Sequence, residues 1–256
     1  MLIESLQNEK IKRLTRLLTK NQERRKAGIF IVEGQQENER ALEYHHEPEE
    51  FFICETIFKG QLPDSKINSV SEKVYEKIAY RGTTEGIIGI YKLEENNLQD
   101  FSSKENSAIV ILESVEKPGN LGAILRSCEA FGIDALIVTD PKTDFYNPNV
   151  IRSSVGCLFG MNIFSASNED TFNFLERNNY NIFTTFMSDD AKHIQEKNLK
   201  NRTAVLFGTE HSGLSHFWKD KGENVLIPMA GTIDSLNLSN AAAITCYEIL
   251  RQKLEK

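Results

Sequence analysis

The sequence lacks the features that mark several large classes of protein. No apolar run among its 256 residues approaches the roughly 18 residues that a membrane-spanning helix needs. The N-terminal stretch MLIESLQNEKIK contains no uninterrupted apolar segment of the signal-peptide kind. We therefore expect a cytoplasmic protein that contacts no membrane.

Cysteine-based chemistry of the familiar kinds is also missing. There are only four cysteines, they are widely spaced among apolar neighbours, and none of them forms a CxxC pair. We expect buried free thiols at Cys54, Cys128, Cys157 and Cys246. A metal site built from Glu210, His211 and His216 is disfavoured, since their spacing fits no zinc pattern. No metal is expected.

Several nucleotide and nucleophile motifs are absent as well. The chain has no GxGxxG dinucleotide fingerprint, no Walker phosphate loop and no GxSxG nucleophile elbow. These absences argue against a dinucleotide-dependent dehydrogenase, a P-loop nucleotide hydrolase and a serine hydrolase of the α/β type.

The composition that is present is that of a globular protein with an uneven charge. Hydrophobic residues make up 40% of the chain, and the net charge of −7 argues mildly against indiscriminate nucleic-acid binding. Residues 1–28 nevertheless carry eight Lys and Arg against three Glu, whereas residues 29–100 carry seven basic and fifteen acidic groups. The first segment is a candidate polyanion contact, although a solvated basic helix face explains it equally well.

The first part of the chain has the pattern of a small α/β domain. Leucine and isoleucine at a helical period predict a helix over 7–26 that ends at Gly28. Strands are expected at 29–34, 51–54 and 86–93, and helices at 35–44 and 71–79, the last capped by Ser71. The polar stretch 94–106 has no period, so we place the domains at 1–98 and 107–256.

The second part alternates strands and helices. Strands are expected at 108–112, 135–139, 181–185, 204–207 and 225–227, and helices at 121–131, 148–155, 170–178 and 238–254. Such alternation predicts a mainly parallel sheet covered on both faces. Ligands of these sheets bind outside the carboxyl ends of the strands.

Three loop segments follow predicted strands and are expected to meet at that edge. KPGNLGAILRS places Asn120 near a helix start and Arg126 further along the helix, a spacing that lets both approach one ligand if the helix points its N-terminus at it. GTEHSGLS is a glycine-flanked loop with one acid, Glu210, and PMAGTIDSLN puts Ser235 and Asn237 before an alanine-rich helix. A surface ion pair for Arg126 and an ordinary capped C-terminal helix are the plainer alternatives.

These motifs carry a family resemblance. KPGNLGAILRSCEAFG, FGTEHSGLS and IPMAGTIDSLNLSNAAAITCYE resemble, in order and spacing, the signature motifs of the SpoU/TrmH branch of the SPOUT RNA 2′-O-ribose methyltransferases. The N-terminal RRKAGIFIVEGQQENERAL and TTEGIIGIY look like the L30e-like RNA-binding domain that precedes the catalytic domain in many of these enzymes. The expected fold is therefore α/β, a small L30e-like domain followed by a SPOUT domain with a C-terminal trefoil knot.

The resemblance implies a site and a cofactor. It implies S-adenosylmethionine bound by the knotted loops, and a homodimer whose active site lies at the subunit interface. By motif, the catalytic residues are expected to be Asn120, Arg126, Glu210, Ser235 and Asn237. The expected cofactor-binding residues are Thr185, Gly208, Thr209, Ile227, Met229 and Leu236.

The implied reaction is methyl transfer to a ribose 2′-hydroxyl, most often of 23S-type ribosomal RNA. A tRNA ribose methyltransferase and a non-catalytic RNA-binding or ribosome-assembly protein on the same fold are the alternatives. Because a guanidinium holds its proton strongly, we expect Arg126 to position phosphate rather than act as the base. The expected RNA contacts are Lys10, Arg13, Arg16, Arg24, Arg25 and Arg81.

Overall fold

The protein consists of two compact units, which are described separately here. The computed structural model describes residues 2–63, 66–80, 85–94, 96–188 and 190–255, so the expected RNA contact Arg81 lies outside the described residues. The first unit comprises residues 1–95 together with 144–160, and the second comprises 96–143 and 161–256. The segment 144–160 therefore packs with the first unit, although the sequence pattern placed it in the second domain.

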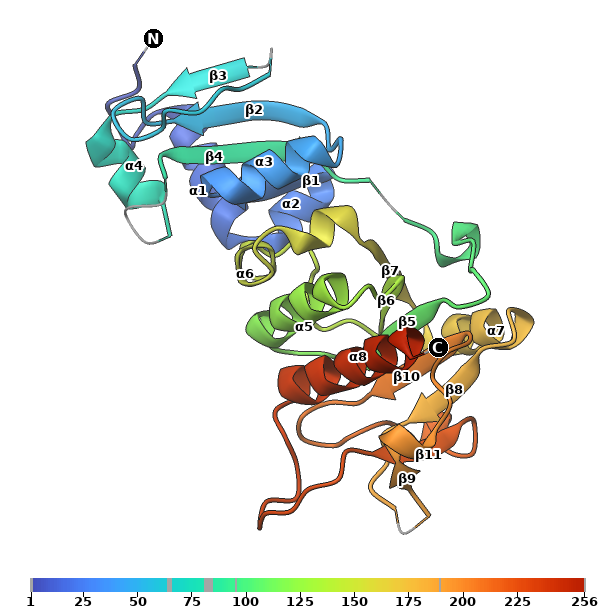
Figure 1. The fold of residues 1–256 in the computed structure, drawn as a ribbon. Coiled ribbons are helices and arrows are strands. Elements are labelled where there is room, and N and C mark those ends of the chain that lie inside the picture. The colour runs from blue at the N-terminus through green and yellow to red at the C-terminus, as the bar shows by residue number, and fades with distance from the viewer. Residues whose placement is uncertain (1, 64–65, 81–84, 95, 189, 256) are drawn as a thin grey trace. The chain divides into compact units, whose positions relative to one another are not determined.

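The first unit is built on a mixed four-stranded sheet with the order β1-β4-β2-β3 (Figure 1). Its strands are β1 (Ile29–Glu33), β2 (Pro48–Ile53), β3 (Lys66–Ser69) and β4 (Ile87–Lys92). Strand β4 pairs antiparallel with β1 and β2, and β3 adds a parallel edge to β2. The unit also contains helices α3 (Gln35–Glu43) and α4 (Glu72–Ile78), and Ser71 caps α4 as expected.

The expected N-terminal helix is two helices. Helix α1 (Glu9–Thr19) and helix α2 (Asn21–Ala27) are separated by Lys20, whose backbone is extended at φ −116° and ψ 106°. Gly28 ends α2 in the left-handed conformation at φ 62°, which a glycine adopts without strain. Residues 19–26 contain neither glycine nor proline, which is why the break was not visible in the sequence.

The segment 144–160 completes an aromatic cluster of the first unit. It contains helix α6 (Pro148–Ser153) and a 3₁₀ turn, η2 (Cys157–Gly160). The ring of Phe30 on β1 lies 4.7 Å from that of Tyr146 and 5.7 Å from that of Phe159 between centroids. His46 packs against Phe159 at 5.1 Å. Burial of these rings stabilises the unit through residues that are distant in sequence.

The second unit contains a seven-stranded sheet in the order β7-β6-β5-β10-β8-β11-β9, and every recorded pairing in it is parallel. Its strands are β5 (Ala108–Glu113), β6 (Ala135–Thr139), β7 (Asn162–Ala166), β8 (Asn181–Thr184), β9 (Lys192–His193), β10 (Thr203–Phe207) and β11 (Glu223–Leu226). The predicted parallel sheet is confirmed. The two edge strands β7 and β9 were not predicted.

The helices of the second unit are α5 (Pro118–Ala130), α7 (Asn168–Arg177) and α8 (Leu238–Leu254), with 3₁₀ turns η1 (Leu98–Asp100), η3 (Ile194–Glu196) and η4 (His216–Trp218). Helices α5 and α8 pack side by side (Figure 1), where the Sγ atoms of Cys128 and Cys246 approach to 4.0 Å. All four cysteines are buried free thiols, as predicted.

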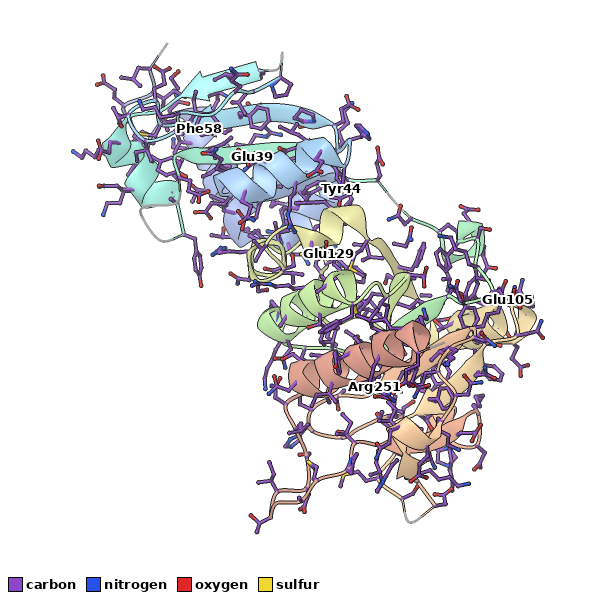
Figure 2. The ribbon with its side chains drawn as sticks, in the orientation of Figure 1. Glu39, Tyr44, Phe58, Glu105, Glu129 and Arg251 are labelled. Carbon is purple, nitrogen blue, oxygen red and sulfur yellow. The ribbon has the colours of Figure 1, made fainter. Side chains whose placement is uncertain are left out.

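The outward side of α8 is partly apolar. Ile244 is 42% exposed and Tyr247 is 54% exposed. Further along the helix, Arg251 (Figure 2) pairs with Glu248 at 2.7 Å. Within the described residues, no helix is both long and apolar enough to cross a membrane.

Candidate active site

The loops at the carboxyl ends of β8, β10 and β11 enclose a pocket of about 960 Å³. All six residues expected to bind the cofactor line it: Thr185, Gly208, Thr209, Ile227, Met229 and Leu236. Two of the five expected catalytic residues, Glu210 and Ser235, line it as well. Its size is that of a pocket for a small molecule or cofactor.

One wall of the pocket is made of backbone. Thr209 and Gly213 exchange two backbone hydrogen bonds, of 3.0 and 3.1 Å, which close the loop after β10 into a tight turn. A Cβ atom added to Gly208 would collide with the backbone of Gly213 and Leu214. Only glycine allows this approach, and it leaves amide and carbonyl groups beside a partly apolar floor. This combination fits the adenosine part of S-adenosylmethionine.

A buried carboxylate fixes that loop, and the sequence reasoning missed it. Glu113 ends β5 and is 4% exposed. Its Oε2 atom accepts a hydrogen bond from the Ser215 backbone N–H at 2.6 Å, and its Oε1 atom accepts from the Ser215 hydroxyl at 2.6 Å. Asn168 donates to Oε1 at 2.7 Å. The available signal was a lone acid closing the apolar run AIVIL, because a buried carboxylate needs several donors.

The three motifs meet in one polar cluster beside the pocket. The Asn120 Nδ2 group on α5 donates to Oε1 of Glu210, and the Asn237 Nδ2 group donates to Oδ1 of Asn120 at 3.4 Å. The ammonium of Lys117 lies 3.7 Å from Oε1 of Glu210. Asn237 also caps α8, because its Oδ1 accepts from the Ser239 backbone N–H at 2.9 Å. Its amide therefore serves both the helix and the cluster.

Arg126 does not join this cluster within the chain. It follows Asn120 by six residues, which is about 9 Å along the axis of α5 and on a different face of the helix. The side chain is exposed, is not part of the pocket wall, and has no hydrogen bond or ion pair to any residue that the structure describes. The expectation that Asn120 and Arg126 reach one ligand stays a prediction.

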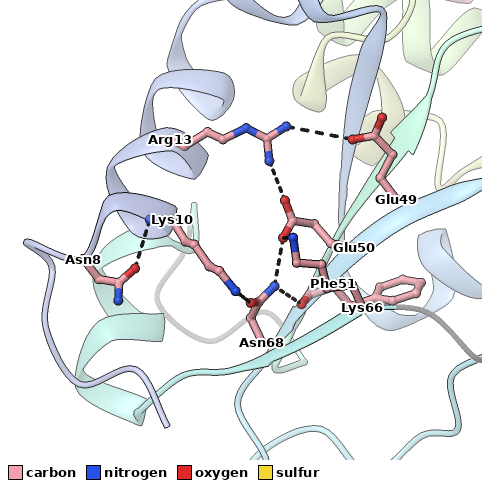
Figure 3. Close-up of polar contacts among 8 residues, drawn as sticks. All are labelled: Asn8, Lys10, Arg13, Glu49, Glu50, Phe51, Lys66 and Asn68. Atoms are coloured by element: carbon pink, nitrogen blue, oxygen red, sulfur yellow. Dashed lines mark hydrogen bonds and ion pairs between the residues drawn. The ribbon is translucent and has the colours of Figure 1, made fainter. Parts of the chain in front are cut away.

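Two of the expected RNA contacts are engaged inside the first unit (Figure 3). Lys10 donates to Oδ1 of Asn68, and Arg13 forms an ion pair with the buried Glu50 and lies 3.9 Å from Glu49. The charge of Arg13 is partly offset by these two carboxylates, whereas Lys10 is held by an uncharged amide and keeps its charge.

A third, Arg24, is removed from the surface altogether. It is 3% exposed, its Nη1 group donates to the Leu17 carbonyl at 2.8 Å, and its Nη2 atom lies 3.7 Å from Asp144. Burial lowers the pKa of Arg24 and the Asp144 carboxylate opposes that shift. This corrects the expectation of an RNA contact, because a buried guanidinium cannot reach a phosphate. Arg16 and Arg25 are exposed.

The comparisons with known proteins agree with the motifs. Residues 107–247 match the family model described as the SpoU rRNA methylase family. The chain belongs to this family. Residues 8–89 match the MRM3-like substrate-binding domain. The resemblance inferred from the three motifs is thereby confirmed.

Individual relatives cover nearly the whole chain. It is 27% identical to the 23S rRNA (guanosine(2553)-2′-O)-methyltransferase RlmP of Bacillus subtilis, over 96% of this chain and 98% of that protein. A crystal structure of an RNA 2′-O ribose methyltransferase is 35% identical and matches with a TM-score of 0.85, over 99% of this chain and 100% of that one. An S-adenosylmethionine-bound rRNA methyltransferase from Sinorhizobium meliloti is 25% identical, with a TM-score of 0.90 over 100% of this chain and 99% of that one.

The described residues form no metal-binding cluster. Among the residues that the structure describes, no three His, Cys, Asp or Glu side chains gather into a group that would hold a metal ion.

Proposed function

We propose that this protein is an S-adenosylmethionine-dependent RNA 2′-O-ribose methyltransferase and that its substrate is 23S-type ribosomal RNA. The observation that carries the proposal is the convergence of three separated motifs on one pocket, with Glu210, Asn120 and Asn237 bonded together beside it. The likeness to the Bacillus 23S rRNA enzyme over almost the full length of both chains supports the choice of RNA.

The cofactor supplies an electrophilic methyl group when it is bound, and the chain has to present the nucleophile. A ribose hydroxyl is a weak nucleophile, so it must be aligned and its proton must be drawn away. Asn120, Ser235 and Asn237 are placed to hold the ribose and its backbone. Glu210 fixes the orientation of the Asn120 amide by accepting from it, and the Asn120 oxygen accepts from the Asn237 amide.

Arg126 serves the pocket of a second copy of the chain in this proposal. It is exposed on α5, outside its own pocket, and α5 packs against α8, whose Ile244 and Tyr247 present apolar surface. A homodimer that buries Ile244 and Tyr247 brings the Arg126 guanidinium of one subunit to the pocket of the other subunit. There it positions the phosphate beside the reacting ribose. The C-terminal segment through the third motif forms the trefoil knot of the SPOUT fold.

A mixing experiment tests this assignment. The Arg126→Ala variant should lose methyl transfer and keep cofactor affinity within a few-fold by calorimetry, since Arg126 does not line the pocket. The Gly208→Ala variant should lose cofactor binding. If Arg126 acts across the interface, exchange of the two inactive chains should restore about a quarter of wild-type activity, because half of the dimers regain one complete site. No recovery after verified exchange would place Arg126 at its own pocket instead.

The RNA species is tested by mapping missing 2′-O-methyl groups in total RNA from a strain without the gene. One lost position in 23S rRNA, refilled by the purified protein and S-adenosylmethionine, is the expected result. A lost position in tRNA would transfer the assignment to that substrate. Unchanged methylation together with intact cofactor binding would favour the non-catalytic alternative.

A further inference from the structure

Tyr80 has the largest exposed fraction of any aromatic side chain that the structure describes. It follows α4 in the first unit and is 63% exposed. Single exposed apolar side chains are common on protein surfaces and need no explanation. What distinguishes Tyr80 is how firmly it is held.

The residue is fixed from two sides. Its backbone N–H donates to Oε1 of Glu33 at 2.7 Å, and Glu33 ends β1 with only 5% of its surface exposed. The guanidinium carbon of Arg152 lies over the ring, 3.8 Å from its centroid. One face of the phenol is thus covered by a cation, and the exposed part of the ring lies away from it. A ring held in this way loses little entropy when something stacks on it.

Arg152 is in turn anchored to its own helix. Its Nη2 group donates to the Pro148 carbonyl and to Oδ1 of Asn149, at 3.4 Å each. No ion pair joins Arg152 to a carboxylate in the described part of the chain. Its positive charge acts both on the Tyr80 ring and on the buried Glu37, whose pKa burial raises and Arg152 helps to lower. Arg152 belongs to the segment 144–160, which lies in the methylase part of the sequence yet packs with the first unit.

The surroundings favour RNA over a protein partner. The residues just before Tyr80 alternate between buried Ile78 and Ala79 and exposed charged side chains such as Lys77, so this described stretch places no apolar patch beside the ring. A protein-docking surface of useful affinity has a contiguous apolar centre. An unpaired nucleobase needs only one flat ring and a cation nearby.

We propose that Tyr80, backed by Arg152, is a stacking platform for an unpaired nucleobase of the RNA substrate. This inference rests on the proposed function and adds a contact to it. Because stacking does not depend on net charge, it suits a unit whose residues 29–100 are acidic overall and whose Lys10, Arg13 and Arg24 are engaged internally. Tyr80 thereby positions the RNA, and Arg152 positions Tyr80.

The test uses the full-length protein and total RNA from a strain without the gene. Tyr80→Leu removes the ring, Tyr80→Phe keeps it, and Tyr44→Leu is the matched control, since Tyr44 is a 46% exposed tyrosine of the same unit that follows α3 (Figure 2). We expect Tyr80→Leu to raise the apparent KM for RNA about tenfold, as for the loss of one base stack. The kcat and the KM for S-adenosylmethionine should stay within about twofold, and Tyr80→Phe and Tyr44→Leu should resemble the wild type. Arg152→Gln should give a smaller rise.

Equal KM values for RNA in Tyr80→Leu and Tyr44→Leu would overturn the inference while leaving the proposed function intact. If the wild-type protein transferred no methyl group to any RNA, the proposed function would fail and the platform with it. If Tyr80→Leu did not fold, ultraviolet cross-linking of the wild-type protein to the RNA decides the matter. A nucleotide cross-linked to Tyr80 supports the platform, and cross-links confined to other peptides refute it.

Discussion

Single side chains in the candidate site have two roles that only the folded chain reveals. Asn237 caps α8 through its carbonyl oxygen and donates to Asn120 through its amide nitrogen, so one side chain connects helix stability to the polar cluster beside the pocket. Removing it therefore has two separable effects, one on folding and one on the reaction.

Asn237→Ala should lower methyl transfer far more than it lowers stability. The lost cap costs about 1 kcal/mol, whereas loss of the Asn120 contact should reduce kcat at least tenfold. Ser167→Ala is the control, because Ser167 caps α7 in the same unit by accepting from Asp170 at 3.0 Å and lies outside the pocket. Both variants should show similar falls in urea midpoint. Equal activity in the two would remove Asn237 from the reaction.

The six residues that the family resemblance assigned to the cofactor all line the pocket. The sequence did not predict the partners of long charged side chains. Arg24 and Glu113 read as ordinary surface or strand-end charges, yet each is buried by residues more than a hundred positions away, Asp144 and Ser215 respectively. Such pairings depend on tertiary packing, which no local pattern records.

The loop after β10 shows how an element can depend on one missing side chain. Gly208 passes so close to Gly213 that a Cβ has no room, and the buried Glu113 holds the far end of the same loop at Ser215. The shape of the loop is therefore set at both ends before any ligand arrives, which lowers the entropy lost on binding.

Gly208→Ala should weaken S-adenosylmethionine binding by at least tenfold, because the loop must open to make room for the alanine side chain. Gly119→Ala is the matched control: the same substitution on α5, with no atom within 4 Å of the added carbon. Calorimetric titration of both variants measures the difference. An unchanged affinity in Gly208→Ala would mean that the loop does not form the cofactor wall.

Among the strands, the sequence predicted the central ones of each sheet and missed the edge strands β3, β7 and β9. Strands β5, β6 and β10 are buried throughout and appear as continuous apolar runs. Strands β3 and β7 lie at sheet edges with two of four and two of five side chains exposed, so their sequences, KINS and NIFSA, lack a strong pattern. The break at Lys20 was missed because residues 19–26 contain no glycine or proline to mark it.

For the molecule as a whole, the segment 144–160 is the feature that the domain pattern did not reveal. It supplies Tyr146 and Phe159 to an aromatic cluster around Phe30 and His46. Burial raises the pKa of Tyr146 to about 12 and lowers the pKa of His46 below its ordinary value of 6.5. The cluster therefore favours neutral side chains.

Stability should fall as the cluster is acidified. The pKa of His46 is lower in the folded state, so the stability that the neutral imidazole contributes to the folded state is complete above pH 6.5. This stability decreases as the pH falls below 6.5 and is lost once the pH is below the pKa of the folded state. His46→Phe should therefore lose less stability than the wild type between pH 7.5 and 5.5. Thermal unfolding midpoints of both proteins at pH 7.5 and pH 5.5 measure this difference. The other histidines are present in both proteins, so their effects cancel in the comparison. Parallel losses would show that His46 does not titrate differently on folding.

The same segment has a consequence for the order in which the chain can fold during its synthesis. Domains generally fold as units when their last residue has emerged from the ribosome. Here the first unit is complete only after Gly160 has been synthesised, and β5, α5 and β6 of the second unit are made before that residue. Until then Phe30 has Tyr91 and His46 as ring partners but lacks Tyr146 and Phe159, so the aromatic cluster is completed only after part of the second unit has been synthesised.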